Sequence, residues 1–216
     1  MAETLSLSLL HFQGTELFDS GRNPHPQFAI GADTSLIPDD GKFGTSLEIP
    51  SYGLVQAGMA VSIPRMRLDT GAWTLDFWWR AGAGYAAGND SDMISFIGDS
   101  GAFKMINAQR NGANFDLERG ANTLVTMTYT NAKADYNHVA LVKLGGFVFI
   151  YENGVGTVTL DLATFGLTTD EYTTFAIGTG TDTGGVDFCG NISEVRFTDA
   201  AKFIGDFTPE TQPYFN

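Results

Sequence analysis

The sequence predicts an all-β fold, a sandwich or barrel of short antiparallel strands. Runs of β-branched and aromatic residues recur at roughly ten-residue spacing, which is typical of such folds. The 216 residues include 26 Gly, 17 Phe, 7 Tyr and 3 Trp, a composition that suits short strands joined by glycine turns. The stretch His138–Val155 adds a hairpin, because two apolar runs flank Gly145-Gly146.

The two glycines of this hairpin fix its register. Glycine takes the positive φ angles of a type I′ turn without strain. The expected facing pairs are Leu144 with Phe147, Val142 with Phe149, and Ala140 with Tyr151. Both faces are largely apolar, so we expect the hairpin to lie within a sheet covered on both sides. The alternative is that the aromatic face forms a partly open concave surface.

The remaining strands follow from local alternation. Leu5–Phe12 and Ser46–Ile49 are expected strands before the clearest one, Trp73–Arg80. In the latter, Trp73, Leu75, Phe77 and Trp79 share one face, and Thr74, Asp76, Trp78 and Arg80 share the other. Further strands are expected at Met93–Ile97, Phe103–Ala108, Asn114–Leu117, Leu124–Tyr129, Thr157–Leu162, Phe175–Ile177 and Asn191–Phe197.

Other stretches are less regular. Residues 25–45 contain scattered glycine and proline, and residues 50–71 are ambiguous because Pro50 and Pro64 interrupt them. Thr168–Tyr172 is expected to form one helical turn, and residues 202–216 an extended C-terminal segment. We find no linker or repeat, so one domain over residues 1–216 is the simplest organisation.

Charge and cysteine content exclude several classes. The chain has 25 acidic and 12 basic residues and a net charge of −13, which argues against nucleic acid as a partner. Its one cysteine, Cys189, excludes an intrachain disulfide. No run approaches the ~20 apolar residues of a membrane span. Residues 1–12 read as a strand and not as a basic leader, so we expect synthesis in the cytoplasm without the secretory route.

Five motifs in order resemble the concanavalin A-like, laminin G-like jelly-roll family. They are Leu9–Gly14 followed by Asp19–Asn23, Lys42–Leu47, Trp73–Trp78, His138–Val142 through Tyr151–Gly154, and Gly190–Phe197. The resemblance spans nearly the whole chain. It implies a two-sheet antiparallel jelly-roll sandwich.

The C-terminal residues resemble a smaller group within this family. Phe203–Pro209 through Pro213–Phe215 is similar to an ending common in members found in bacteriophage virion proteins. It implies a structural virion protein, a capsid decoration or tail accessory protein that binds other virion proteins. An exposed C-terminal segment would carry such contacts, so deleting Phe203–Asn216 is expected to weaken assembly more than folding. The sequence contains no coiled-coil heptads, so any homo-oligomer must form through the sandwich itself or through partner proteins.

The sequence does not favour an enzyme. Some members of this fold are glucanases that use paired carboxylates on one strand. Asp116 and Glu118 have the right spacing, but they end a strand beside Arg119, where a solvated edge explains them. His11, His25 and His138 show no metal spacing. His138 opens a strand and is expected to be a packed or capping residue.

Calcium is the best cofactor candidate. Some family members bind calcium beside the first loop and near the closing strand, and the resemblance places these ligands at Asp19, Asn23 and Glu194. Such a site needs six to eight hard oxygens. Ser193 stands where the family often has aspartate, which removes one charged ligand. The alternative is that Asp19 and Asn23 make Asx turns, which their residue types and positions favour.

Host-surface glycans are the alternative partner. In this interpretation the chain is a lectin-like adhesion module not tied to virion structure. Trp78 and Tyr151 can stack on sugar rings, and Asp182 and Asp187 in a glycine-rich loop can bind a cation or a sugar hydroxyl. Exposure of Trp78 and Tyr151 together beside a polar groove favours the lectin, and their burial favours the virion scaffold.

Overall fold

The computed structural model has two antiparallel sheets and confirms the predicted jelly-roll sandwich. It describes residues 6–13, 16–19, 28–30, 34–50, 59–82, 91–98, 101–107, 114–120, 122–128, 135–166, 170–179 and 188–214. No helix in these ranges is long and apolar enough to span a membrane.

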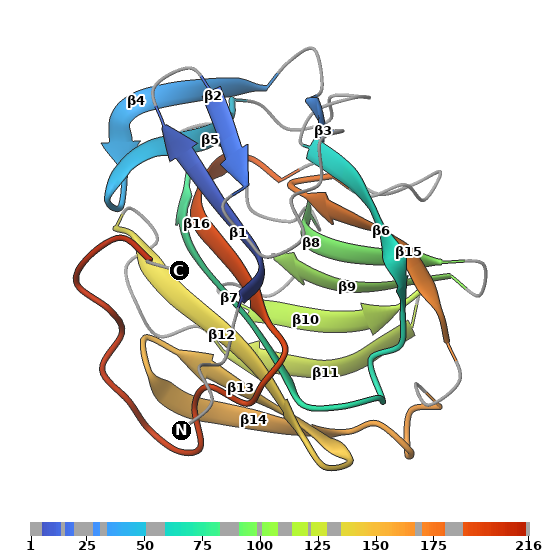
Figure 1. Cartoon of the computed structure of the whole chain (residues 1–216). Coiled ribbons are helices and arrows are strands. Elements are labelled where there is room, and N and C mark those ends of the chain that lie inside the picture. The colour runs from blue at the N-terminus through green and yellow to red at the C-terminus, as the bar shows by residue number, and fades with distance from the viewer. Residues whose placement is uncertain are drawn as a thin grey trace.

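A nine-stranded sheet forms one layer (Figure 1). Its path is β14-β13-β12-β7-β16-β1-β2, and the hairpin β4-β5 joins it through β16. The bounds are β1 Ser6–Gln13, β2 Glu16–Asp19, β4 Ser35–Gly41, β5 Gly44–Ile49, β7 Trp73–Ala81, β12 Asn137–Leu144, β13 Phe147–Glu152, β14 Val155–Asp161 and β16 Gly190–Thr198.

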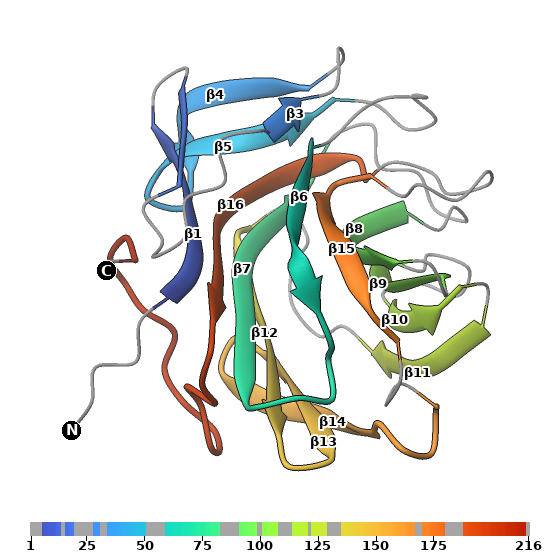
Figure 2. The same ribbon diagram turned by 45° about the vertical axis from the view of Figure 1, so that its right-hand side comes forward.

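A seven-stranded sheet forms the second layer, and Figure 2 shows the two layers side by side. Its order is β11-β10-β9-β8-β15-β6-β3. The bounds are β3 Phe28–Ile30, β6 Met59–Met66, β8 Ser91–Gly98, β9 Gly101–Asn107, β10 Asn114–Arg119, β11 Asn122–Thr128 and β15 Tyr172–Ile177.

The main core lies between the two sheets. Trp79 of β7 meets Phe115 of β10 edge to face, with ring centroids 5.0 Å apart, and Phe96 of β8 meets Phe197 of β16 at 6.1 Å. The predicted grouping of Trp73, Leu75, Phe77 and Trp79 on one face of β7 is confirmed, and this face is the inner one, since all four belong to this core. Burial of apolar surface on this scale is the dominant stabilising contribution to a domain.

The central hairpin forms with the predicted register. Leu144 pairs with Phe147, Val142 with Phe149, and Ala140 with Tyr151. The turn differs from the expected type I′, because only Gly145, with φ of +61°, has a positive φ. A single positive φ at the first central residue is the pattern of a type II′ turn.

Several irregular stretches proved to be strands. The helical turn expected at Thr168–Tyr172 is wrong at its end, because Tyr172 begins β15. Residues 59–66 form β6 despite Pro64. β3 pairs only with Met59–Val61, and the register against β15 shifts between Tyr172 and Thr174, so Pro64 avoids a regular ladder on both sides. β4 tolerates Pro38 because it pairs with β5 alone.

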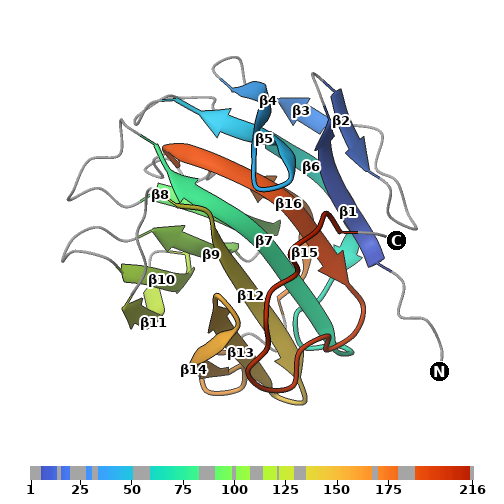
Figure 3. The same ribbon diagram turned by 90° about the vertical axis from the view of Figure 1, so that its left-hand side faces the viewer.

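The outer face of the nine-stranded sheet is covered by residues 199–214, which we call the strap. Figure 3 shows the strap, in dark red, crossing over β16, β7 and β12. Ala140, Val142 and Tyr151 form a second apolar cluster with Phe203 and Phe207 of the strap. The hairpin is therefore covered on both sides, as predicted.

Candidate functional site

Two polar clusters lie side by side on the outer face of the nine-stranded sheet. The closed cluster consists of Asp76, His138 and Arg196 on the sheet together with Glu210 and Tyr214 of the strap, which covers them. The open cluster consists of Asp40, Lys42, Arg80, Tyr136 and Asn191 and lies at the other end of β7. Trp78 separates them, because its ring contacts both His138 and Lys42.

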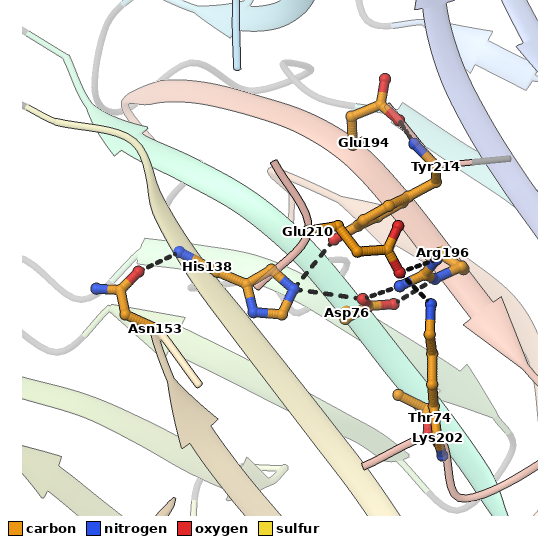
Figure 4. Close-up of polar contacts among 9 residues, drawn as sticks. All are labelled: Thr74, Asp76, His138, Asn153, Glu194, Arg196, Lys202, Glu210 and Tyr214. Atoms are coloured by element: carbon orange, nitrogen blue, oxygen red, sulfur yellow. Dashed lines mark hydrogen bonds and ion pairs between the residues drawn. The ribbon is translucent and has the colours of Figure 1, made fainter. Parts of the chain in front are cut away.

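The closed cluster is centred on a buried ion pair (Figure 4). Asp76 accepts hydrogen bonds from Arg196 at 2.9 Å from Nε to Oδ1 and at 2.5 Å from Nη2 to Oδ2. His138 Nε2 lies 3.3 Å from Asp76 Oδ2 and 3.0 Å from the Tyr214 hydroxyl. The Arg196 guanidinium stacks 3.6 Å above the Tyr214 ring. Because Asp76 and Arg196 are removed from water, their charges are satisfied by each other and, for Arg196, also by Glu210.

Ionisation follows from this pairing. Burial alone would raise the pKa of Asp76, but the hydrogen bond to His138 and the charge of Arg196 outweigh it and lower the pKa to about 2. Burial opposes the charge of Arg196, yet Asp76 raises the guanidinium pKa above its ordinary value. Burial and the Asp76 charge raise the pKa of Tyr214 well above 10. The cluster therefore holds a permanent ion pair beside a neutral phenol.

We expect the chain to lose stability in acid because of Asp76. The pKa of Asp76 is about 2 in the folded chain and ordinarily 3.8. At pH values above 3.8 the ionised carboxylate therefore stabilises the fold by about 2 kcal/mol. This contribution disappears as the pH falls from about 4 to about 2. Thermal melting at pH 7, 4, 3 and 2 checks it. The native chain should lose more stability over this window than Asp76→Asn does, and parallel curves would contradict the assignment.

Further bonds fix the strap along its length. Thr74 Oγ1 donates to Ala200 O at 2.8 Å and accepts from Lys202 N at 2.9 Å. Arg196 and Lys202 both pair with Glu210. Phe207 N donates to Gly154 O at 2.8 Å. Gly154 has φ of +84°, and a Cβ there would lie 1.8 Å from Phe207 O, so this contact requires glycine.

The open cluster combines two cations with aromatic rings and one carboxylate. Arg80 Nη2 lies 2.6 Å from Asp40 Oδ2 and 3.3 Å from Asn191 Oδ1. The guanidinium carbon lies 5.0 Å from the Tyr136 ring centroid, and the Tyr136 hydroxyl donates to Asp40 O at 2.6 Å. Lys42 Nζ lies 4.3 Å from the Trp78 ring centroid. Arg80, Asp40 and Tyr136 are half-buried and Lys42 is exposed, so a ligand can reach this cluster.

Sequence comparison places the chain in a family. A family profile described as the concanavalin A-like lectin/glucanases superfamily matches residues 56–202, more than half of the chain. The chain belongs to this superfamily. No curated protein matches this chain in sequence.

Solved structures show the same fold at low identity. The binding domain of botulinum neurotoxin DC, solved with rat synaptotagmin II, is 12% identical with a TM-score of 0.71, covering 92% of this chain and 49% of that one. Domain 4 of a Geobacillus stearothermophilus GH43 extracellular arabinanase, solved with arabinotriose, is 16% identical with a TM-score of 0.66, covering 92% and 94%. A Trypanosoma rangeli sialidase, bound to 2,3-difluorosialic acid, is 14% identical with a TM-score of 0.67, covering 92% and 31%. The superfamily member spans about half the length of the botulinum domain.

The two aromatic residues proposed as ligand contacts are buried in this superfamily member. Trp78 and Tyr151 are each only 5% exposed. Tyr214 and Phe43 pack on Trp78, and Phe207 meets Tyr151 with centroids 5.4 Å apart. The lectin interpretation expected both rings to be exposed beside a polar groove. Contact of either ring face with a ligand would require its covering residues to move.

Of the three proposed calcium ligands, the structure describes only the side chain of Glu194. Glu194 is buried at a bulge of β16, with φ of +52°, and its Oε2 accepts the Tyr214 N–H at 3.1 Å. Asp19 ends β2, where only the backbone is described, and Asn23, Asp182 and Asp187 lie outside the described residues. Within the described ranges, no three His, Cys, Asp or Glu side chains form a metal-binding group. Calcium binding remains a prediction.

Only weak indications of the residues that form these clusters are present in the sequence. Asp76 and Arg196 are charged positions in strands whose neighbours are apolar, which indicates a buried partner. The predicted packed role of His138 is confirmed, since that side chain is 1% exposed. Lys42 was noted only as part of a family-like motif, and no local pattern indicated a site role for Asp40, Lys42 or Tyr136, because tertiary packing joins them to Arg80.

Proposed function

We propose that the chain is a non-catalytic glycan-binding module whose ligand site is the open cluster. The supporting observation is the accessible combination of Arg80, Lys42 and Asp40 with the Tyr136 ring on one sheet face. Sugar recognition needs hydrogen-bonding groups for hydroxyls and an aromatic surface for the ring. Fold neighbours solved with arabinotriose and with SialylT bind saccharides, which supports this choice.

The state of the buried carboxylate supports a non-catalytic role. A general acid must hold its proton near neutral pH, and the Asp76 pKa of about 2 is far below that range. Its two oxygens are held by Arg196, and the strap covers the pair. The other two carboxylates of the clusters are also paired: Asp40 with Arg80 and Asn191, and Glu210 with Arg196 and Lys202.

We further propose that the module is mounted on a bacteriophage particle as a decoration or tail accessory protein. This rests on the resemblance of Phe203–Phe215 to the ending of phage virion members. Of these, residues 203–214 pack on their own sheet as part of the strap, so contacts with other virion proteins would use other surfaces.

A glycan array and a particle-binding assay on the same purified chain test both proposals. Specific saccharide binding that is lost in Tyr136→Ala supports the glycan module and its site. Saturable attachment to phage particles stripped of accessory proteins supports the virion setting. Attachment to particles without any saccharide binding would exclude the glycan module, and saccharide binding without attachment would exclude the virion setting.

A further inference from the structure

Most hydrogen-bond acceptors of the open cluster are already occupied. Asp40 Oδ2 accepts from Arg80 and, at 3.1 Å, from Asn191 Nδ2. Asn191 Oδ1 accepts from Arg80, and the Asp40 carbonyl accepts from Tyr136. Counting bonds from described residues, Asp40 Oδ1 is the one carboxylate or amide oxygen of this cluster that accepts none.

The hydrogen-bond donors of the open cluster, in contrast, are largely unused. Lys42 carries three N–H donors, and within the described part of the chain its ammonium contacts only the rings of Trp78 and, at 5.9 Å, Phe43. Among the residues that the structure describes, Arg80 bonds through Nη2 alone, which leaves the donors on Nε and Nη1. A site with surplus donors is complementary to a ligand group rich in acceptor oxygens.

Both cations are held in place by aromatic faces. Lys42 lies over Trp78, and Arg80 lies over Tyr136. Because both side chains are partly ordered beforehand, they lose less conformational entropy when a ligand binds. The negative charges of Asp40 and Glu48 act on Arg80. Lys42 is not paired with the carboxylate of the open cluster, so it supplies the positive charge that is available to a ligand.

We propose that the open cluster binds the carboxylate of an acidic saccharide, with Lys42 as its charged donor and Arg80 as a second donor. This inference deepens the proposed function and rests on it. Because an ionised acceptor makes shorter and stronger hydrogen bonds than a neutral one, the carboxylate is the group that distinguishes this ligand from a neutral sugar.

Calorimetric titration of the full chain with matched saccharides tests the proposal. The probes are trigalacturonic acid against its carboxyl-reduced form, and sialyllactose against lactose. We expect the acidic member of at least one pair to bind about tenfold tighter than its neutral partner, which is the scale of one charge-assisted hydrogen bond. The pair that shows this difference identifies the source of the carboxylate as a uronate or a sialate.

Two lysine variants distinguish binding at a local site from a general effect of the chain's net charge. Lys42→Met keeps the apolar stem over Trp78 and should weaken acidic binding about tenfold. Lys202→Met is the matched control, because Lys202 also lies near aromatic rings on this face but its ammonium is paired with Glu210. Acidic binding by Lys202→Met should equal that of the native chain.

The outcomes distinguish the two proposals. Equal affinity for acidic and neutral members, or equal loss in both lysine variants, overturns the carboxylate inference and leaves the glycan module standing. Absence of binding to every saccharide, including those of the glycan array, overturns both.

Discussion

Asp76→Asn is expected to lower the free energy of unfolding by about 3–5 kcal/mol. Asparagine keeps the size of the side chain but leaves the Arg196 guanidinium, which is 3% exposed, without its buried counter-charge. Removing one partner of a buried pair is far more costly than removing both. Urea unfolding of the two proteins, followed by Trp fluorescence, measures the difference.

Two comparison variants isolate the cause of this loss. Asp199→Asn changes the same residue type at an exposed position after β16 and should alter stability by less than about 0.5 kcal/mol. Adding Arg196→Met to Asp76→Asn removes the uncompensated charge and should recover part of the loss. A loss below about 1 kcal/mol for Asp76→Asn would show that water reaches the ion pair.

Deleting Phe203–Asn216 is expected to destabilise the fold by more than about 5 kcal/mol, a large share of the 5–15 kcal/mol typical of a domain. The deletion removes the Tyr214 ring, which is 1% exposed, and the stacked rings of Phe203 and Phe207. It also uncovers Trp78 and Tyr151. The expected result is a lower melting temperature and binding of the dye ANS to the uncovered face.

This result would reverse the expectation drawn from the sequence, in which the same deletion weakens assembly more than folding. Ile204→Ala is the matched control within the strap, since Ile204 is 80% exposed and its loss should leave the melting temperature unchanged. An unchanged melting temperature in the deletion variant itself would mean that the strap contributes little to the fold.

The predicted parts of the fold are those that short-range patterns encode. Alternation in Trp73–Arg80 assigned both faces of β7 correctly, because a strand repeats every two residues. The Gly145-Gly146 turn gave the hairpin register because the pairing is local. β4 and β6 were not predicted, since Pro38 and Pro64 obscure strands whose pairing partners happen to tolerate them.

The polar clusters depend on contacts that no local pattern specifies. The sequence placed Asp76 beside Trp78 on the outer face of its strand, but it did not reveal that the strap would bring Tyr214 there. Nor did the sequence predict the contact of Lys42 with Trp78, because the turn after β4 meets Trp78 only once the sheet has formed. Charged residues inside covered strands are the feature that could have indicated the closed cluster.

The ion pair beneath the strap also bears on how fast the chain folds. Asp76 and Arg196 are 120 residues apart, and His138 and Tyr214 are 76 apart. Each contact closes a long loop, so the entropic cost of ordering the intervening chain precedes the energetic return. Domains dominated by such non-local pairings fold in milliseconds to seconds and not in microseconds. Folding of this chain is therefore expected to be slow, with topology and not local propensity setting its rate.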